Sequence, residues 1–223
     1  ARQKVGNYAG VTVERKEGQF VSPGGQSWRV LDLPGAYSLL AATPDEAITR
    51  DVIAGTRPGE AAPVGLVCVV DATNLRLNLR MVLELQTLGV PMVLAINMMD
   101  QAYKRGIHID TTKLQTELGI PVVETIAVRS GGEQALLAQL DALNWGQLPE
   151  PRAPRPMERI AQTPVEETHK RVGHLLATCV KTPDHVPSHT AKLDRYVLNP
   201  VFGPVILAAL MFLVFQAVFS WAA

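Results

Sequence analysis

The sequence has no surplus of charge of either sign and very few cysteines. Among its 223 residues, 21 are lysine or arginine and 21 are aspartate or glutamate, so the formal net charge is zero. Proteins that bind nucleic acid as their main partner need a basic surface, so this balance argues against that class. The two cysteines, Cys68 and Cys179, are too few for a disulfide framework, and both fall in apolar stretches. We therefore expect reduced, buried thiols and a cytosolic location for this part of the chain.

A phosphate-binding loop of the pattern G-x-x-x-x-G-K-S/T is also absent from the 223 residues. The sequence begins at Ala1, in what we predict to be a loop over residues 1–9, without a methionine or an apolar leader. It ends at Ala223, directly after an apolar run. We interpret it as a fragment that is long enough for one sizeable core and an appendage.

Strand and helix patterns alternate from Val64 to Leu143. Continuous apolar runs at 64–71 and 91–97 are typical of parallel strands buried on both faces, and a further strand is predicted at 121–128. Helical patterns follow at 75–88, 110–119 and 133–143. The alternation predicts an α/β fold, a doubly wound and mostly parallel sheet with helices on both faces. Before it, we expect a β-hairpin with strands near 11–15 and 28–31, and a helix at 41–54 capped by Thr43.

The last part of the chain differs in composition. Prolines between residues 149 and 164 predict a linker, and a helix is expected at 166–180. The run from Pro200 to Trp221 has no charged residue, and its ~22 residues reach ~33 Å as a helix, enough to cross a bilayer. A buried core helix is the alternative, but it would ordinarily show a polar face. Lys192 and Arg195 precede the run, which places its amino-terminal side in the cytoplasm. We expect three regions, at 1–148, 149–190 and 191–223.

A carboxylate and a glycine follow the apolar strand Val30-Leu31. At the carboxyl end of a parallel strand, Asp32 can hold a magnesium ion through water, and the Gly35 N–H can reach the terminal phosphate of a nucleotide. The alternative is a strand that simply runs into a Pro-Gly turn. Upstream, the Thr12 hydroxyl could join the magnesium shell, or Thr12 could be an ordinary strand threonine. The polar residues that follow later strands favour the nucleotide-binding interpretation of this Asp-Leu-Pro-Gly pattern over the simple turn.

Asn97 and Asp100 follow the next buried strand, where α/β sheets place their ligand contacts. A carboxylate at Asp100 can accept hydrogen bonds from guanine N1–H and from its exocyclic amino group, whereas adenine offers neither donor. Each such bond to a charged group contributes roughly 1.5 to 3 kcal/mol, so two of them decide between the bases. Asn97 would fix the loop and meet the purine N7. Backbone N–H groups of Ala127, Val128 and Arg129 could touch the guanine O6, although an ordinary strand end is equally compatible.

Four blocks of the sequence closely resemble the GTPase domain of the ferrous iron transport protein B family. They are residues 5–18, 32–39 and 97–100, and 193–200 at the approach to that family's first membrane helix. Other small GTPases usually carry lysine in the place of Met98, which favours the iron transporter. The resemblance implies a first switch at Gly10, Val11, Thr12, Val13 and Glu14; a second at Asp32, Leu33, Pro34 and Gly35; a guanine reader at Asn97, Met98, Met99 and Asp100; and a last nucleotide loop at Ala127, Val128 and Arg129.

The resemblance also implies a P-loop-type GTPase fold, with GTP or GDP and Mg²⁺ as cofactors and K⁺ as a further candidate. Thr12 and Asp32 would be the magnesium ligands, and Thr12 and Gly35 the catalytic positions. Hydrolysis should be slow, because Ala36 stands where signalling GTPases carry glutamine. The phosphate loop and first strand would precede Ala1, so we expect the fragment alone to be inactive and added amino-terminal residues to restore GTP binding. Alanine at Ala127, where serine is common, leaves only main-chain contacts.

By the same resemblance, Fe²⁺ is the transported substrate, the bacterial inner membrane is the location, and the remaining transmembrane domain is a partner. A small cytosolic accessory protein or a second copy of the chain stays open as a further partner. Two rival readings also stay open: a membrane-tethered regulatory module that binds guanine nucleotide without hydrolysing it, and an unrelated α/β binding domain. His185 and His189 are four residues apart, but Pro183 and Pro187 oppose a regular helix, so a solvated loop is expected rather than an iron site.

Overall fold

The computed structural model describes residues 2–8, 13–40, 43–143, 145, 164–183 and 196–221. The chain divides into two compact units, Ala1–Thr182 and Pro183–Ala223. We describe each unit by itself. The histidine pair His185 and His189, the basic residues Lys192 and Arg195, and the first-switch residues Gly10, Val11 and Thr12 lie outside the described residues.

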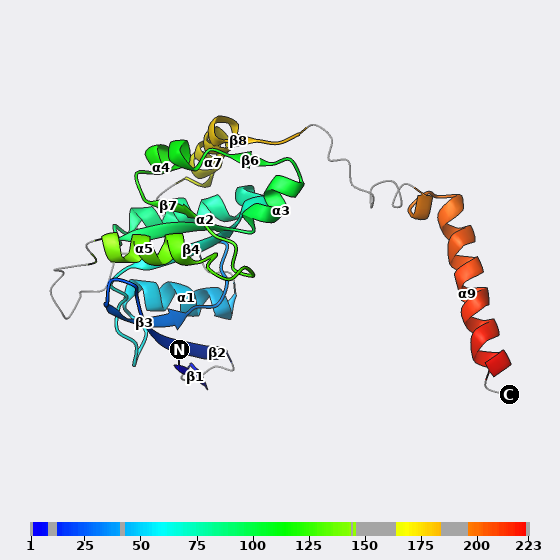
Figure 1. Ribbon diagram of the computed structural model, residues 1–223, viewed down its shortest axis with the longest axis horizontal. Coiled ribbons are helices and arrows are strands. Elements are labelled where there is room, and N and C mark those ends of the chain that lie inside the picture. Colours follow the sequence, from blue (N-terminus) through cyan, green and yellow to red (C-terminus); the bar gives the residue numbers. More distant parts are fainter. Residues whose placement is uncertain are drawn as a thin grey trace. The chain divides into compact units, whose positions relative to one another are not determined.

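An antiparallel sheet forms the amino-terminal side of the first unit (Figure 1). It contains β1 (Arg2–Asn7), β2 (Glu14–Val21) and β3 (Ser27–Asp32) in that order. The predicted hairpin is confirmed, although its first strand runs from Glu14 to Val21 rather than near 11–15, and its turn closes where Gly25 adopts a positive φ of 83°. The loop predicted for residues 1–9 is wrong for β1, which pairs with β2 along its whole length. Pairing of the backbone holds β1 in place, although Val5 is 60% exposed and the strand shows no apolar alternation.

The helix α1 (Pro44–Ala54) follows this sheet and begins and ends as the sequence predicts. The Thr43 hydroxyl accepts a hydrogen bond from the Glu46 N–H, and Asp45 and Glu46 lie in the first turn, where they complement the helix dipole. Gly55 ends the helix with a left-handed backbone at φ 76°. The inner face of α1 buries Ile48 and Val52 in a small core with Tyr8.

A parallel sheet of β4 (Leu66–Asp71), β5 (Met92–Asn97) and β7 (Val122–Glu124) forms the centre of the first unit. The 3-10 turn η1 (Ala72–Asn74) and α2 (Leu75–Thr87) connect β4 to β5, and α4 (Thr111–Leu118) precedes β7. Side chains from alternate positions of β5 enter different cores, since Leu94 packs with Leu79 of α2 and Val93 packs with Leu140 of α5 (Gln134–Ala142). Helices therefore cover both faces, and the α/β prediction is confirmed.

Of the three parallel strands, β5 agrees with its prediction, and β4 and β7 differ from theirs. β5 is buried from Met92 to Ile96, as expected for a strand covered on both faces. In β4, however, Val67 is 41% and Val69 is 61% exposed, so burial on both faces is wrong for this strand. β7 ends at Glu124 rather than at 128, because the chain turns there to hydrogen-bond to the end of β5.

Four further elements complete the first unit. They are α3 (Met99–Lys104), β6 (His108–Ile109), α7 (Val165–Cys179) and β8 (Val180–Lys181), of which only α7 was predicted. β6 and β8 pair antiparallel, which joins the chain after α7 to the α/β domain. Val172, Leu175 and Cys179 of α7 enter the main core as the sequence predicts. Of the two thiols expected to be buried, Cys179 is buried, whereas Cys68 is only partly buried.

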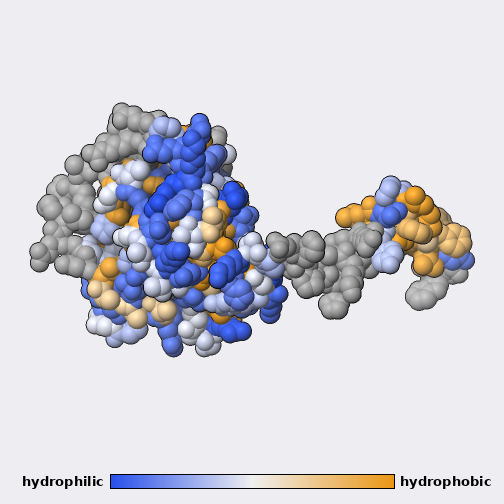
Figure 2. Space-filling model, turned by 90° about the horizontal axis from the view of Figure 1, so that it is seen from above, coloured by the Kyte–Doolittle hydropathy of each residue, from blue (hydrophilic) through white to orange (hydrophobic). Residues whose placement is uncertain are grey.

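Most of the described residues of the second unit belong to α9 (Phe202–Trp221). The Asn199 side chain caps its start, because Oδ1 accepts hydrogen bonds from the N–H groups of Val201 and Phe202. Residues Phe202–Phe219 have a mean hydropathy of 2.3, and none of this stretch is buried. Figure 2 shows hydrophobic side chains gathered along this helix. Its length and composition fit a transmembrane helix, as predicted.

Candidate functional site

The end of β5 is joined to the loop after β7 through one side chain. Asn97 Oδ1 accepts a hydrogen bond from the Ala127 backbone N–H at 3.0 Å and one from the Thr125 hydroxyl at 3.4 Å. Thr125 is buried, and its backbone N–H donates to the Ile96 carbonyl at 2.8 Å. The carboxyl ends of the two parallel strands thus carry one connected loop cluster. The sequence predicted that Asn97 fixes a loop, and the structure places Ala127 within its reach.

Met98 has a strained backbone at the centre of this cluster. Among the residues described, it is the one non-glycine residue with a positive φ, at 62°. A left-handed conformation costs an ordinary side chain roughly 1 to 2 kcal/mol, and such conformations cluster at functional sites. The turn at Met98 starts α3, buries Met99 in the core at 1% exposure and places Asp100 in the first helical turn. Gln101 Nε2 donates to Asp100 Oδ2 at 3.1 Å, which leaves Oδ1 open to another donor.

The segment after β3 is held by three side chains from other elements. The Thr49 hydroxyl of α1 donates to the Pro34 carbonyl at 2.7 Å, and the Tyr8 hydroxyl donates to the Asp32 carbonyl at 3.4 Å. At the far end of the segment, the Glu84 carboxylate accepts from the Leu39 N–H at 2.6 Å. The Gly35 N–H, predicted to donate to a phosphate, therefore lies between two backbone groups that side chains hold in place, the Pro34 carbonyl and the Leu39 N–H.

Tyr8 links the first block of the sequence to the strand that ends at Asp32. Its side chain is only 2% exposed, and the Arg57 guanidinium lies 5.7 Å from its ring centroid. Burial, with a further contribution from the Glu60 carboxylate, raises the pKa of Tyr8 above its ordinary value. Its hydroxyl therefore stays protonated at neutral pH and remains a donor to the Asp32 carbonyl. The sequence pattern assigned Tyr8 to a loop and missed this role.

A cavity of about 360 Å³ lies between the segment after β3 and the exposed side of β4. Leu33, Pro34, Gly35, Ala36 and Tyr37 line one side. The other sides come from α1, β4 and α2, through Thr49, Ile53, Leu66, Val67, Cys68, Val69, Asn78, Met81 and Leu85. The second-switch residues of the sequence prediction thus border an open space rather than packed core. In the described part of the chain, no hydrogen bond or ion pair joins Asp32 to Asn97 or Asp100.

Asp32 is the described residue best suited to a magnesium ion. It ends β3 with an exposed carboxylate, next to the cavity-lining Leu33. Mg²⁺ keeps several waters and is usually held by one or two carboxylates together with substrate phosphates, so a single carboxylate fits this mode of binding. Among the described residues there is no group of three or more His, Cys, Asp or Glu side chains that could hold a metal unaided. Thr12, the other predicted ligand, lies outside the described residues.

The pH dependence of Cys68 alkylation tests whether the thiol is buried in the wall of this cavity. Burial raises the pKa of its thiol from 9.0 to about 11. Because the thiolate is the reactive form, alkylation by iodoacetamide at pH 8 should be about 100-fold slower than for a thiol of ordinary pKa. The rate should keep rising as the pH rises from 9 to 11. Mass spectrometry of the labelled protein, with a Cys68→Ala variant to identify the site, measures this rate, and a plateau near pH 9 would contradict the expectation.

The amino-terminal region matches a known family. Residues 1–140 match the family model described as ferrous iron transport protein B. The Fe(2+) transporter FeoB of Salmonella typhimurium is 43% identical over 144 residues, which are 65% of this chain and 18% of that protein. The Fe(2+) transporter FeoB of Escherichia coli K12 is 41% identical over 141 residues, or 63% of this chain and 18% of that protein. The chain thus spans less than a fifth of the curated relatives it matches.

Solved structures give the same result for the fold. The cytosolic domain of L. pneumophila FeoB is 29% identical with a TM-score of 0.66, covering 82% of this chain and 91% of that one. The cytosolic domain of the T. maritima FeoB iron transporter, in a GDP form, is 25% identical with a TM-score of 0.66, covering 81% and 89%. The predicted P-loop-type GTPase fold is confirmed by these neighbours. Sequence and structure together show that the chain belongs to the ferrous iron transport protein B family.

Proposed function

We propose that this chain is the guanine-nucleotide-binding part, with the first membrane helix, of a bacterial ferrous iron transporter. The observation that carries the proposal is the hydrogen bond from the Ala127 N–H to Asn97 Oδ1, which joins two loops at the carboxyl ends of neighbouring parallel strands. This edge of an α/β sheet is where ligands bind. The proposed nucleotide-binding part covers residues 1–148, the linker and helical segment 149–190, and the membrane part 191–223.

Base recognition rests on Asn97, Asp100 and the loop of Ala127, Val128 and Arg129. Asp100 accepts from guanine N1–H and from the exocyclic amino group, and the Val128 N–H donates to O6. The neighbouring Ala127 and Arg129 N–H groups shape this loop instead, because they donate to Asn97 Oδ1 and to the Ile126 carbonyl. The turn at Met98 supports this role, because it places Asp100 in the first turn of α3, where Gln101 Nε2 also holds its Oδ2. Met99 anchors the same turn in the core, at 1% exposure.

Phosphate sensing rests on the two switches. The Gly35 N–H donates to the terminal phosphate of GTP, and Gly10, Val11, Thr12, Val13 and Glu14 form the first switch. Asp32 and Thr12 hold Mg²⁺, which supplies charge neutralisation at the β- and γ-phosphates when bound. Loss of the terminal phosphate releases the Gly35 segment. The position of Gly35 supports the proposal, because Gly35 is exposed and lines an open cavity rather than packed core.

The membrane part connects nucleotide state to iron passage in this proposal. α9 fits a transmembrane helix, and the relatives are named Fe(2+) transporters. Lys192 and Arg195 precede the helix, and basic residues favour the cytoplasmic side of a membrane helix, so in this proposal its amino-terminal end faces the cytoplasm and the helix spans the bacterial inner membrane. Fe²⁺ is then the transported substrate, and the remaining transmembrane helices carry the pore.

Nucleotide titration of the full-length protein tests this proposal. We expect GTP and GDP to bind, and ATP to bind far more weakly. Asn97→Ala removes the acceptor for the Ala127 N–H and should weaken GTP binding by about 10-fold. Asn74→Ala is a matched control, because Asn74 makes no side-chain cap bond at the start of α2. Equal affinity for GTP and ATP in the unaltered protein would contradict the proposal.

The second candidate is a regulatory module that binds guanine nucleotide and does not hydrolyse it. Ala36, at the position after Gly35, favours this candidate because it has no side chain that can orient water. Phosphate release by the full-length protein in lipid vesicles, with and without Fe²⁺, distinguishes the two. Slow turnover supports the GTPase, and tight GTP binding with no turnover supports the regulatory module.

A further inference from the structure

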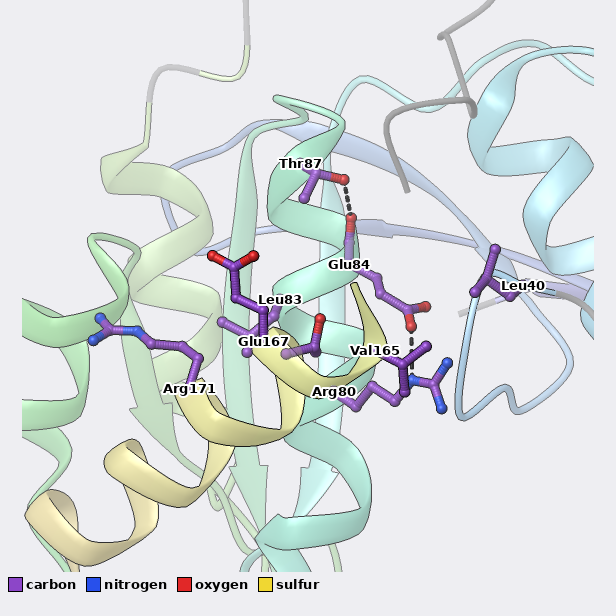
Figure 3. A pocket seen from close by; sticks show the side chains of 9 residues that line it. Leu40, Arg80, Leu83, Glu84, Thr87, Val165, Glu167 and Arg171 are labelled. Carbon is purple, nitrogen blue, oxygen red and sulfur yellow. Dashed lines mark hydrogen bonds and ion pairs between the residues drawn. The ribbon is translucent and has the colours of Figure 1, made fainter. Parts of the chain in front are cut away.

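A buried carboxylate outside the predicted site holds the segment that follows Gly35. Glu84 lies on α2 with 7% exposure, in the wall of a small cavity of about 170 Å³ between α2 and α7. Arg80, one turn earlier on α2, donates from Nε to Glu84 Oε1 at 2.8 Å. Figure 3 shows the Glu84 side chain pointing to Arg80, while its backbone carbonyl accepts from Thr87. No motif in the sequence singled out Glu84.

Two residues that follow the second switch, Ser38 and Leu39, donate hydrogen bonds to the remaining acceptor positions of the Glu84 carboxylate. The Leu39 N–H donates to Oε2 at 2.6 Å, and the Ser38 hydroxyl lies 2.9 and 3.0 Å from the two carboxylate oxygens. Leu39 itself is 2% exposed and belongs to the main core. Hydrogen bonds to an ionised carboxylate are about twice as strong as neutral ones. The carboxylate therefore fixes the carboxyl-terminal end of the segment firmly.

Glu84 and Thr49 form hydrogen bonds with opposite ends of the segment at residues 34–39. Thr49 fixes the Pro34 carbonyl, and Glu84 fixes the Leu39 N–H. Only residues 35–38 lie between these two anchors, and Gly35 has nothing within 4 Å of the position a Cβ would take. With both ends held, the directions available to the Gly35 N–H are few. Release of one end would let a glycine explore many more conformations.

We infer that Glu84 is a positioning residue, which orients the Gly35 N–H toward the terminal phosphate by holding Ser38 and Leu39. The inference rests on the proposed function, since it requires that Gly35 contacts GTP. It predicts a selective effect. Loss of the anchor weakens binding of a nucleotide with a terminal phosphate and leaves GDP binding nearly unchanged, because GDP makes no contact with the Gly35 N–H.

The test compares the affinities of GMPPNP, a GTP analogue with a terminal phosphate, and GDP for the full-length protein. Glu84→Ala should weaken GMPPNP binding by about 10-fold relative to GDP, the value of one strong hydrogen bond. Glu84→Gln keeps an acceptor for the Leu39 N–H and a polar partner for Ser38, so it should restore most of the ratio. Glu117→Gln is the control, since Glu117 lies on α4 and pairs with Arg171 of α7 at 3.1 Å rather than with Ser38 or Leu39.

A second variant keeps the inference testable if Glu84→Ala fails to fold. Ser38→Ala removes the hydroxyl that donates to Glu84 and accepts from Arg80 and the Leu40 N–H, and it should shift the GMPPNP to GDP ratio in the same direction. Combined with Glu84→Ala, its effect should be less than the product of the two single effects, because both variants remove the contact between Ser38 and Glu84. An unaltered protein that binds neither nucleotide overturns the proposed function. A protein that binds both, with an unchanged ratio in Glu84→Ala or Ser38→Ala, overturns this inference alone.

Discussion

Replacing Asp100 by asparagine is expected to abolish the preference of the full-length protein for GTP over ATP. The Asp100 carboxylate accepts two hydrogen bonds from guanine, whereas the asparagine side chain directs an amino group at the guanine amino group. Each lost bond to a charged group costs roughly 1.5 to 3 kcal/mol, so the preference should fall by at least about 100-fold. Competition titration of GTP against ATP measures the change.

A change of base should rescue this variant. Xanthine carries a carbonyl oxygen where guanine carries the exocyclic amino group, so the amide of Asp100→Asn can donate to it. Xanthosine triphosphate should therefore bind the variant better than GTP does. Asp110→Asn is the matched control, since Asp110 also lies at a helix start but caps α4 through the Lys113 N–H at 2.9 Å. An unchanged GTP preference in Asp100→Asn would remove the base-recognition proposal.

Long, regular features of the fold were predictable because their signals are local. The apolar run at 91–97 predicts β5, and the cap residues Thr43 and Asp110 predict the starts of α1 and α4. The uncharged run from Pro200 predicts α9 in the same way. In each case the pattern that forms the element is contained within it, so no knowledge of distant residues is needed.

Features that depend on distant residues were not predictable. β1 exists because β2 pairs with it, and the exposed face of β4 depends on what lies beside it. The same holds for the site. The residue types at Asn97 and Asp100 identify the guanine reader, but nothing in the sequence relates Tyr8 to Asp32, Thr125 to Asn97 or Glu84 to Leu39. These contacts span 24 to 45 residues.

The core position Leu94 should be among the most sensitive to truncation. It lies in the middle of β5 with 0% exposure, between β4 and β7, and packs in the main core with α2 and α7. Leu94→Ala should lower the free energy of unfolding of this region by about 2 to 5 kcal/mol, through lost burial and the cavity left behind. Amide hydrogen exchange of β4, β5 and β7 in the full-length protein measures the loss.

The consequence for the site distinguishes Leu94 from a residue that touches the nucleotide. Leu94→Ala removes no contact at Asn97, three residues further along β5, so folded molecules should keep their preference for GTP over ATP while the strand opens more often. Leu77→Ala, on α2 at 47% exposure, is the matched control and should change exchange little. If the amide hydrogens of β5 exchanged at the same rate in Leu94→Ala, burial of Leu94 would not be what stabilises this strand and positions the guanine-binding residues at 97–100. The cluster at Asn97 and Ala127 would then need another support.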